Sequence, residues 1–224
     1  MTGGDRAGIL NAQVADPAWL DDAVRQVARV PAAVARLFPA VARHCGRGPL
    51  INPRPQQAGW TVADAARVLL LVALPLDGTA LAEQVAMLYR HGDAAEKRAV
   101  LLALPSLDIG DGATGLLLDA IATNDPRLVA AAVGPYARHL GAHMWRQAVL
   151  KCVFMEIPLI VVADLDQRAD TELGRMLAAL ADERRVAGRT TPADATALLA
   201  LITAGEQARS RGHVRSQDQE KEAR

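Results

Sequence analysis

The stretch TVADAARVLLLVALPLDGTALAEQVAMLYRHGDAAEKRAVLLALP, residues 61–105, decides the fold class. Its apolar residues recur every three or four positions, and this periodicity predicts amphipathic helices. Capping residues, Gly and Pro divide the stretch into these predicted helices: 61–74, 79–91 and 93–104. Asp93 and Glu96 fit the capping box of a helix start, which explains both residues without catalysis.

The same start and stop signals recur on both sides of this stretch. Asp16 followed by Pro17, for example, predicts an N-cap and a first helical turn. Further helices are predicted over these ranges: 17–30, 31–44, 112–122, 126–133, 139–155, 170–187 and 191–204. Residues 157–162 allow a buried strand or a short buried helix, and we favour the helix because no partner strand is evident elsewhere.

These helices predict an all-α fold of stacked antiparallel helical hairpins. Hydrophobic residues make up 51% of the 224 residues and aromatic residues only 3%, which is typical of helices packed through small side chains. A HEAT-like stack is the first expectation, with an irregular α-bundle as the alternative. We expect a single domain over residues 1–205, in which residues 46–59 form a long loop rich in Pro and Gly. The charged segment 206–224 lacks apolar periodicity and is expected to be disordered.

Composition excludes several classes of function. Lys and Arg total 25 and Asp and Glu total 25, so the zero net charge gives no general attraction to nucleic acid or to a membrane surface. The apolar runs fall short of the roughly 18–20 residues that span a membrane, and the N-terminus lacks a signal pattern, so we expect a cytoplasmic protein. The two Cys residues form no spaced motif, and no phosphate-binding loop occurs, so neither a metal nor a cofactor is predicted.

One predicted helix, HLGAHMWRQAVLKCVFM over residues 139–155, suggests a binding surface. At 100° per residue its polar side chains fall on one arc, called here the polar arc: His139, His143, Arg146, Gln147 and Lys151. The arc holds no carboxylate, so it would suit an anionic small molecule. The alternative is the ordinary solvent face of an amphipathic helix. His139 and His143 are also spaced as a metal pair with Glu156 as a third ligand, but the basic neighbours disfavour a cation.

Several short motifs follow one another along residues 91–189. They are HGDAAEKRAVLLALP (91–105), TND (123–125), GPY and RH (134–139), W-x-Q-x-V-L-K-x-x-F (145–154), R-A-D-x-x-L-x-x-M-L (168–177) and D-E-R-R-x-A-G-R (182–189). In order and spacing they resemble the EboA family over roughly residues 60–189. Gly134 and Arg146 depart from the family pattern, so the chain resembles a diverged member. The resemblance implies a role in moving precursors of bacterial secondary metabolites such as scytonemin.

The resemblance and the polar arc together give the candidate site. The catalytic candidates are His139, His143 and Lys151. The ligand-binding candidates are Asn124, Tyr136, Arg138, Trp145, Arg146, Gln147, Arg168 and Glu183. Some have structural explanations: Asn124 precedes a helix as a cap, Tyr136 fits a core or a pocket wall, and Arg168 with Glu183 fits a buried pair.

Two main hypotheses of function follow. In the first, the chain binds or carries a small metabolite, with an anionic compound as one option, or acts as a scaffold for a biosynthetic enzyme of the same pathway. In the second, it is an enzyme of secondary metabolism whose arc performs acid–base chemistry on a carbonyl or anionic compound. A third possibility is a role through protein–protein contacts alone. A shallow, apolar groove would favour the first hypothesis.

Overall fold

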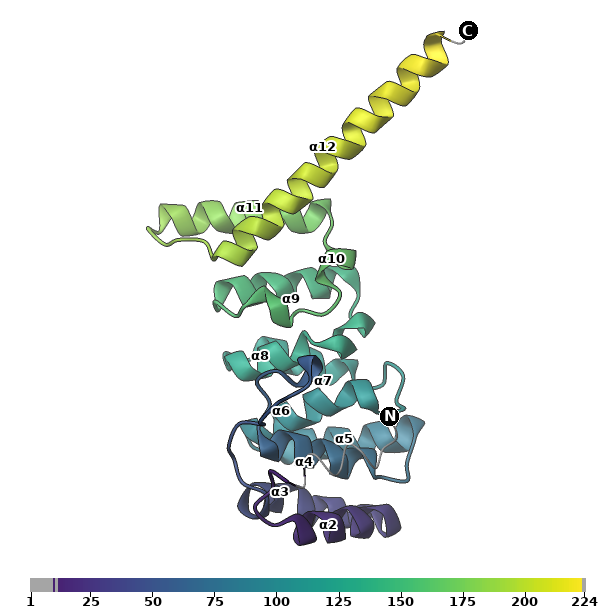
Figure 1. Ribbon diagram of the computed structural model, residues 1–224. Coiled ribbons are helices and arrows are strands. Elements are labelled where there is room, and N and C mark those ends of the chain that lie inside the picture. Colours follow the sequence, from purple (N-terminus) through teal and green to yellow (C-terminus); the bar gives the residue numbers. More distant parts are fainter. Residues whose placement is uncertain (1–9, 11, 223–224) are drawn as a thin grey trace. The chain divides into compact units, whose positions relative to one another are not determined.

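The computed structural model describes residue 10 and residues 12–222, and within these it contains helices but no β-strand (Figure 1). The prediction of an all-α fold is confirmed. The chain divides into two compact units, one ending at His139 and one beginning at Leu140. The single domain expected over residues 1–205 and the HEAT-like stack remain predictions.

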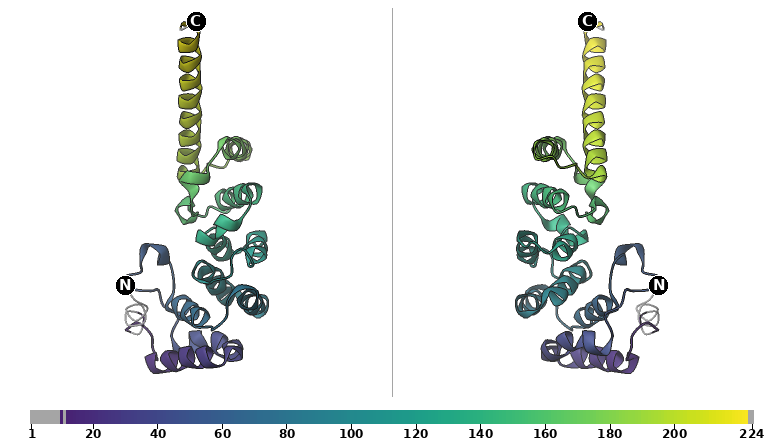
Figure 2. Two further views of the ribbon diagram at one scale, coloured as in Figure 1. Left: turned by 90° about the vertical axis from the view of Figure 1, so that its right-hand side faces the viewer. Right: turned by 90° about the vertical axis from the view of Figure 1, so that its left-hand side faces the viewer.

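The first unit consists of helices joined mostly by short turns, with one long loop between α3 and α4 (Figures 1 and 2). Its α-helices are α2 (Pro17–Arg29), α3 (Val34–His44), α4 (Val62–Val72), α5 (Gly78–His91), α6 (Ala94–Ala103), α7 (Thr114–Ala122) and α8 (Pro126–Ala132). Short 3-10 helices lie at Pro31–Ala33, Pro55–Gln57, Leu104–Ser106 and Pro135–His139. The predicted capping box is confirmed, because the Asp93 carboxylate accepts from the backbone N–H of Glu96 at 2.8 Å.

The expected long loop over residues 46–59 holds no α-helix and is tied to the chain that follows it. The backbone N–H of Leu50 donates to Trp60 at 2.9 Å, and that of Val62 donates to Gly48 at 2.9 Å. The loop has no α-helix or sheet to pair its backbone N–H and C=O groups, and these two hydrogen bonds pair some of them.

Helices α4 and α6 pack against each other through buried charges. Asp64, only 2% exposed, forms an ion pair with Arg98. Arg67 is also buried, and its guanidinium donates to the carbonyl of Phe38 at 3.2 Å and lies 3.5 Å from the Glu96 carboxylate. Burial lowers the pKa of Arg67, while the nearby carboxylates favour its charged form. Asp64 completes a capping box with Thr61 at the start of α4, as Glu96 does with Asp93 at the start of α6. The acids of both capping boxes therefore also belong to the network between the two helices.

The second unit contains α9 (Ala142–Phe154), α10 (Leu165–Arg168), α11 (Thr171–Val186) and α12 (Ala193–Glu222). The segment between α9 and α10 includes a 3-10 helix at Leu159–Val161, which agrees with the helical interpretation of residues 157–162. It is not buried throughout, because Leu159 is 3% exposed but Ile160 is 91% exposed. Arg146 near the start of α9 pairs with Asp170 at the start of α11, and Glu156 after α9 pairs with Arg184 near the end of α11. The two helices therefore run in the same direction.

The last helix is longer than the sequence predicted. We expected it to end near residue 204 and the segment 206–224 to be disordered, but α12 continues as a helix to Glu222, and residues 223–224 lie outside the described part. The segment after residue 204 contains no Pro and is rich in Arg, Gln and Glu, which have high helix propensity, and its Gly205 and Gly212 do not end the helix. The absence of apolar periodicity was therefore a poor guide to where the helix stops.

Close packing of α11 on α12 makes a testable prediction at Gly174. A Cβ atom at this position would lie 2.9 Å from Cγ2 of Ile202, a stiff β-branched side chain on α12. We expect Gly174→Ala to lower the free energy of unfolding by about 1–3 kcal/mol, as overpacking does. Denaturant unfolding followed by circular dichroism measures this.

A matched control lies in α7. Gly115 is also helical, but a Cβ there would meet nothing within 4 Å. Gly115→Ala should raise the free energy of unfolding by about 0.5–1 kcal/mol through helix propensity alone. If Gly174→Ala stabilises the protein as much as Gly115→Ala, the close approach of α11 and α12 is wrong.

Candidate functional site

The helix that carries the polar arc begins later than predicted. Gly141 has extended backbone angles (φ −58°, ψ 152°) and is the N-cap of α9, whereas His139 ends the 3-10 helix of the first unit. The prediction that His139 and His143 share one helix is therefore wrong, and their metal-pair spacing disappears with it. Gly is an acceptable N-cap residue, so Gly141 was the available signal for this boundary.

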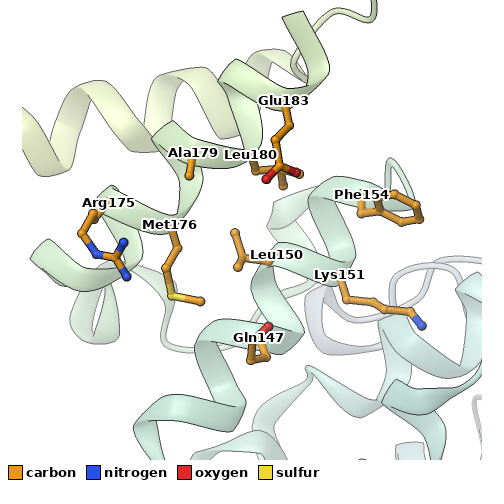
Figure 3. Close-up of a pocket in the computed structure, with 9 residues that line it drawn as sticks. All are labelled: Gln147, Leu150, Lys151, Phe154, Arg175, Met176, Ala179, Leu180 and Glu183. Carbon is orange, nitrogen blue, oxygen red and sulfur yellow. The ribbon is translucent and has the colours of Figure 1, made fainter. Parts of the chain in front are cut away.

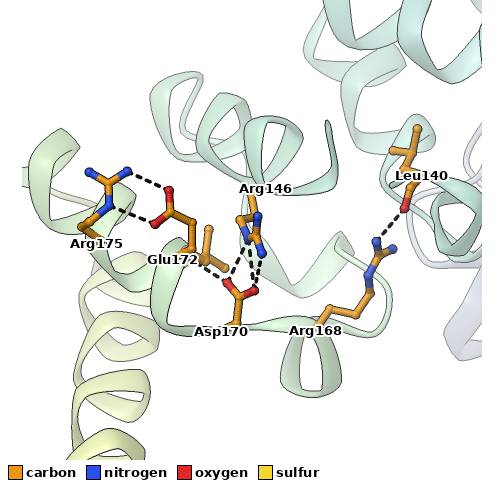
Figure 4. Close-up of polar contacts among 7 residues, drawn as sticks. Leu140, Arg146, Arg168, Asp170, Glu172 and Arg175 are labelled. Carbon is orange, nitrogen blue, oxygen red and sulfur yellow. Dashed lines mark hydrogen bonds and ion pairs between the residues drawn. The ribbon is translucent and has the colours of Figure 1, made fainter. Parts of the chain in front are cut away.

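Arg146 serves to join two helices. Its Nε donates to Oδ1 of Asp170 at 2.9 Å, and the same carboxylate accepts from the backbone N–H of Leu173 at 2.9 Å (Figure 4). The hydrogen bonds from Arg146 lower the pKa of Asp170, and Asp170 in turn raises the pKa of Arg146. The guanidinium therefore fixes the start of α11 against α9 and is already engaged by a carboxylate.

An open groove of about 410 Å³ lies between α9 and α11, and we call it the α9–α11 groove (Figure 3). It is lined by Gln147, Leu150, Lys151, Phe154, Arg175, Met176, Ala179, Leu180 and Glu183. Of the predicted site residues, Gln147, Lys151 and Glu183 come together here. Its surface is mostly apolar, and the exposed Phe154 ring, 61% accessible, forms one edge.

The charges around this groove are mixed, which differs from the basic surface that the sequence suggested. Arg175 from α11 donates to both carboxylate oxygens of Glu172, at 2.9 and 2.7 Å (Figure 4). Lys151 and Glu183 bring one charge of each sign to the lining. The groove therefore suits an apolar compound with a polar group better than a small inorganic anion.

Trp145 lies in the core of the second unit. Its side chain is 1% exposed, and the guanidinium of Arg168 lies 4.6 Å from its ring centroid. Arg168 also donates to the carbonyl of Leu140 at 2.7 Å (Figure 4), and its pKa is lowered by burial. Glu183 is exposed and lines the groove, so the suggested buried pair of Arg168 with Glu183 is not formed.

Other candidates lie in the first unit. The Tyr136 hydroxyl donates to the carbonyl of Gly110 at 2.8 Å and accepts from the N–H of Ala113 at 3.1 Å, which closes the loop before α7. Tyr136 is therefore a core residue, and burial raises the pKa of its hydroxyl. The ring of His139 lies 4.7 Å from the Tyr136 ring.

The remaining candidates are surface residues. Asn124 and Arg138 are exposed, as is His143 on the first turn of α9. His143 does not line the α9–α11 groove. The structure thus does not gather a catalytic set from His143 and Lys151 around this groove.

Glu156 and Cys152 are further residues considered for metal binding or thiol chemistry. Glu156, considered as a third metal ligand, pairs instead with Arg184 at 2.7 Å. Among the side chains that the structure describes, no three from His, Cys, Asp or Glu are grouped closely enough to hold an ion. Burial raises the pKa of the Cys152 thiol to about 12, so it stays protonated at neutral pH.

Of the side of the groove that α11 contributes, the sequence predicted only Glu183 and missed the other lining residues. Met176, Ala179, Leu180 and Glu183 follow the helical spacing i, i+3, i+4 and i+7 on one face. The sequence alone shows this spacing, but it does not show which neighbouring helix this face packs against. Arg near the end of a helix is favourable to the helix dipole wherever its side chain lies, so the position of Arg184 in the sequence did not indicate that the structure buries it.

Comparison with known proteins identifies one family. Residues 50–199 match the family model described as "Metabolite traffic protein EboA". No curated protein and no solved structure matches the chain. Across the described helices, none combines the length and the apolar character needed to cross a membrane.

Proposed function

The chain belongs to the EboA family, and from this premise we propose that it binds a small, mostly apolar metabolite reversibly in the α9–α11 groove. The observation that carries the proposal is the groove itself. It combines an apolar lining with a few polar side chains, which is the usual composition of small-molecule sites. Its volume of about 410 Å³ falls within the ~300–1,000 Å³ typical of such sites.

Reversible binding suits this groove better than catalysis. Acid–base catalysis needs a positioned donor or acceptor within hydrogen-bond reach of the substrate, in a site that excludes water. The α9–α11 groove is open to water, and the titratable side chains in its lining are Lys151, Arg175 and Glu183, with no His, Asp, Cys or Tyr. An acid or base there would not be shielded from water. We therefore favour a carrier over an enzyme.

The polar side chains would orient the compound rather than transform it. Gln147 offers both an amide donor and a carbonyl acceptor, whereas Lys151 and Glu183 offer charges of opposite sign. We further propose that the compound is an intermediate of a bacterial natural-product pathway. A biosynthetic enzyme of the same pathway would be the partner that delivers or receives it in the cytoplasm.

Native mass spectrometry of the protein purified from its own host tests the proposal. We expect a fraction of the wild-type protein to carry a compound whose mass adds to that of the chain. Phe154→Ala removes an exposed ring from the groove without opening the core, and it should reduce the occupancy about ten-fold. Lys151→Met should reduce the occupancy only if the compound is acidic.

Met87 provides the matched control, because it is an exposed apolar side chain on α5 of the first unit. Met87→Ala should retain the compound at the wild-type level. Equal retention by Phe154→Ala and Met87→Ala would move the binding site away from the α9–α11 groove. Persistent absence of a compound from the wild type would count against the carrier role.

A further inference from the structure

We propose that a second groove, between α11 and the first turns of α12, binds a small amphipathic anion. This α11–α12 groove has a volume of about 460 Å³. It is lined by Leu177, Ala181, Asp182, Arg185, Arg189, Thr190, Thr191, Ala195, Thr196 and Leu199. It shares no lining residue with the α9–α11 groove, so the inference does not depend on the proposed function.

The apolar part of the ligand would lie on a floor supplied by two helices. Leu177 and Ala181 come from α11, and Ala195 and Leu199 come from α12. Most of the groove surface is apolar, so covering it with a short alkyl chain or a ring removes that surface from water. A fully hydrated inorganic ion would leave the floor uncovered.

The anionic part would lie against Arg185 and Arg189. Asp182 pairs with Arg185 at 3.1 Å, so these three side chains together retain one positive charge. Among the side chains that the structure describes, Arg189 makes no ion pair. Thr190 and Thr191 line the same groove, and a Thr hydroxyl can donate a hydrogen bond to an anion.

The motif DERRVAGR at residues 182–189 explains this arrangement. Successive residues at the end of α11 point in different directions, so Glu183 lines the α9–α11 groove while Arg185 lines the α11–α12 groove. Arg184 between them is buried. One helix end thus supplies side chains to two separate grooves.

The loop that carries Thr190 is held in place before any ligand arrives. The buried Arg184 donates to the carbonyl of Thr190 at 2.9 Å and to the Glu156 carboxylate at 2.7 Å. The backbone N–H of Arg189 donates to the carbonyl of Arg184 at 2.8 Å, and Gly188 supplies the positive φ of 69° that the turn requires. A preformed loop loses less conformational entropy when it binds a ligand.

These features select carboxylates or phosphate monoesters that carry an apolar chain or ring. A guanidinium binds either head group through charge-assisted hydrogen bonds. Both classes share the required chemistry, an anionic head beside an apolar body. Titration with one compound of each class distinguishes carboxylates from phosphate monoesters.

The experiment is an NMR titration of the full-length, ¹⁵N-labelled protein with octanoate and, separately, with octyl phosphate. We expect saturable shifts of the backbone amides of Arg189, Thr190 and Thr191 with one or both probes, and the tighter probe identifies the preferred head group. Arg189→Glu should weaken this binding about five- to ten-fold, because it replaces attraction with repulsion at an exposed side chain. Arg175→Glu in the α9–α11 groove is the matched control, and it should change the affinity for the same probe less than about two-fold.

Two further probes divide the ligand into its parts. Inorganic phosphate lacks the apolar chain and octanol lacks the charge, so each should bind at least about five-fold more weakly than the tighter amphipathic probe. The inference would be overturned if inorganic phosphate or octanol bound as tightly as the amphipathic probe. Unchanged affinity of Arg189→Glu, or amide shifts confined to α9, would also overturn it.

Discussion

Replacing Asp64 with alanine is expected to lower the free energy of unfolding by about 3–5 kcal/mol, the range found when one partner of a buried ion pair is removed. Asp64 is 2% exposed and pairs with Arg98 of α6. Its carboxylate also accepts from the backbone N–H of Thr61 at 2.7 Å and from the Thr61 hydroxyl at 2.6 Å. Removing it therefore breaks the half of the α4 capping box that uses this carboxylate and one of the two charge contacts between α4 and α6.

Denaturant unfolding of Asp64→Ala and of a surface control measures this effect. Arg25 forms an ion pair with Asp22 at 3.5 Å, but its side chain is 60% exposed. Arg25→Ala should change the free energy of unfolding by less than about 0.5 kcal/mol, since exposed pairs contribute little. A loss below about 1 kcal/mol for Asp64→Ala would show that the α4–α6 network contributes little to stability.

In the second unit, Trp145→Ala is expected to cost about 3–5 kcal/mol, the range for removing a large buried aromatic side chain. Trp145 is 1% exposed, and its substitution leaves a cavity beneath α9 and removes the ring under Arg168. The indole Nε1 is buried without a hydrogen-bond partner among the described residues. Trp145→Phe, which keeps an aromatic ring and loses no hydrogen bond there, should therefore cost only about 1–1.5 kcal/mol.

The neighbouring Met144 is the control, because it shares α9 but is 38% exposed. Met144→Ala should cost less than about 1 kcal/mol in the same unfolding experiment. If Trp145→Phe proved as damaging as Trp145→Ala, the indole N–H would have a partner that the structure does not show. If Trp145→Ala behaved like Met144→Ala, the burial of Trp145 would be wrong.

Local sequence signals predicted the helices better than they predicted the site. Capping residues, Gly and Pro act within one turn of the chain, so the capping box of Asp93 and Glu96 was readable without a structure. The same logic failed at two boundaries. The start of α9 depends on Gly141, and α12 continues to Glu222 through Gly205 and Gly212, which as stop signals would have ended it earlier.

The polar arc shows why a helical wheel does not define a binding surface. The wheel placed Arg146 and Lys151 together, because it considers one helix at a time. Asp170, 24 positions after Arg146, takes up the guanidinium when α11 packs beside α9. Only Gln147 and Lys151 of the arc reach the α9–α11 groove, where α11 completes the lining.

The sequence by itself determined that the chain is helical, where most helices lie, and that it resembles the EboA family. These properties depend on local propensity and on ordered motifs, which the chain carries without reference to its packing. The tertiary structure alone decided which charges are buried, as with Arg184, which pairs with the exposed Glu156, and where two grooves form beside α11. Those features arise between segments far apart in sequence, and their contacts depend on the direction in which helices pack.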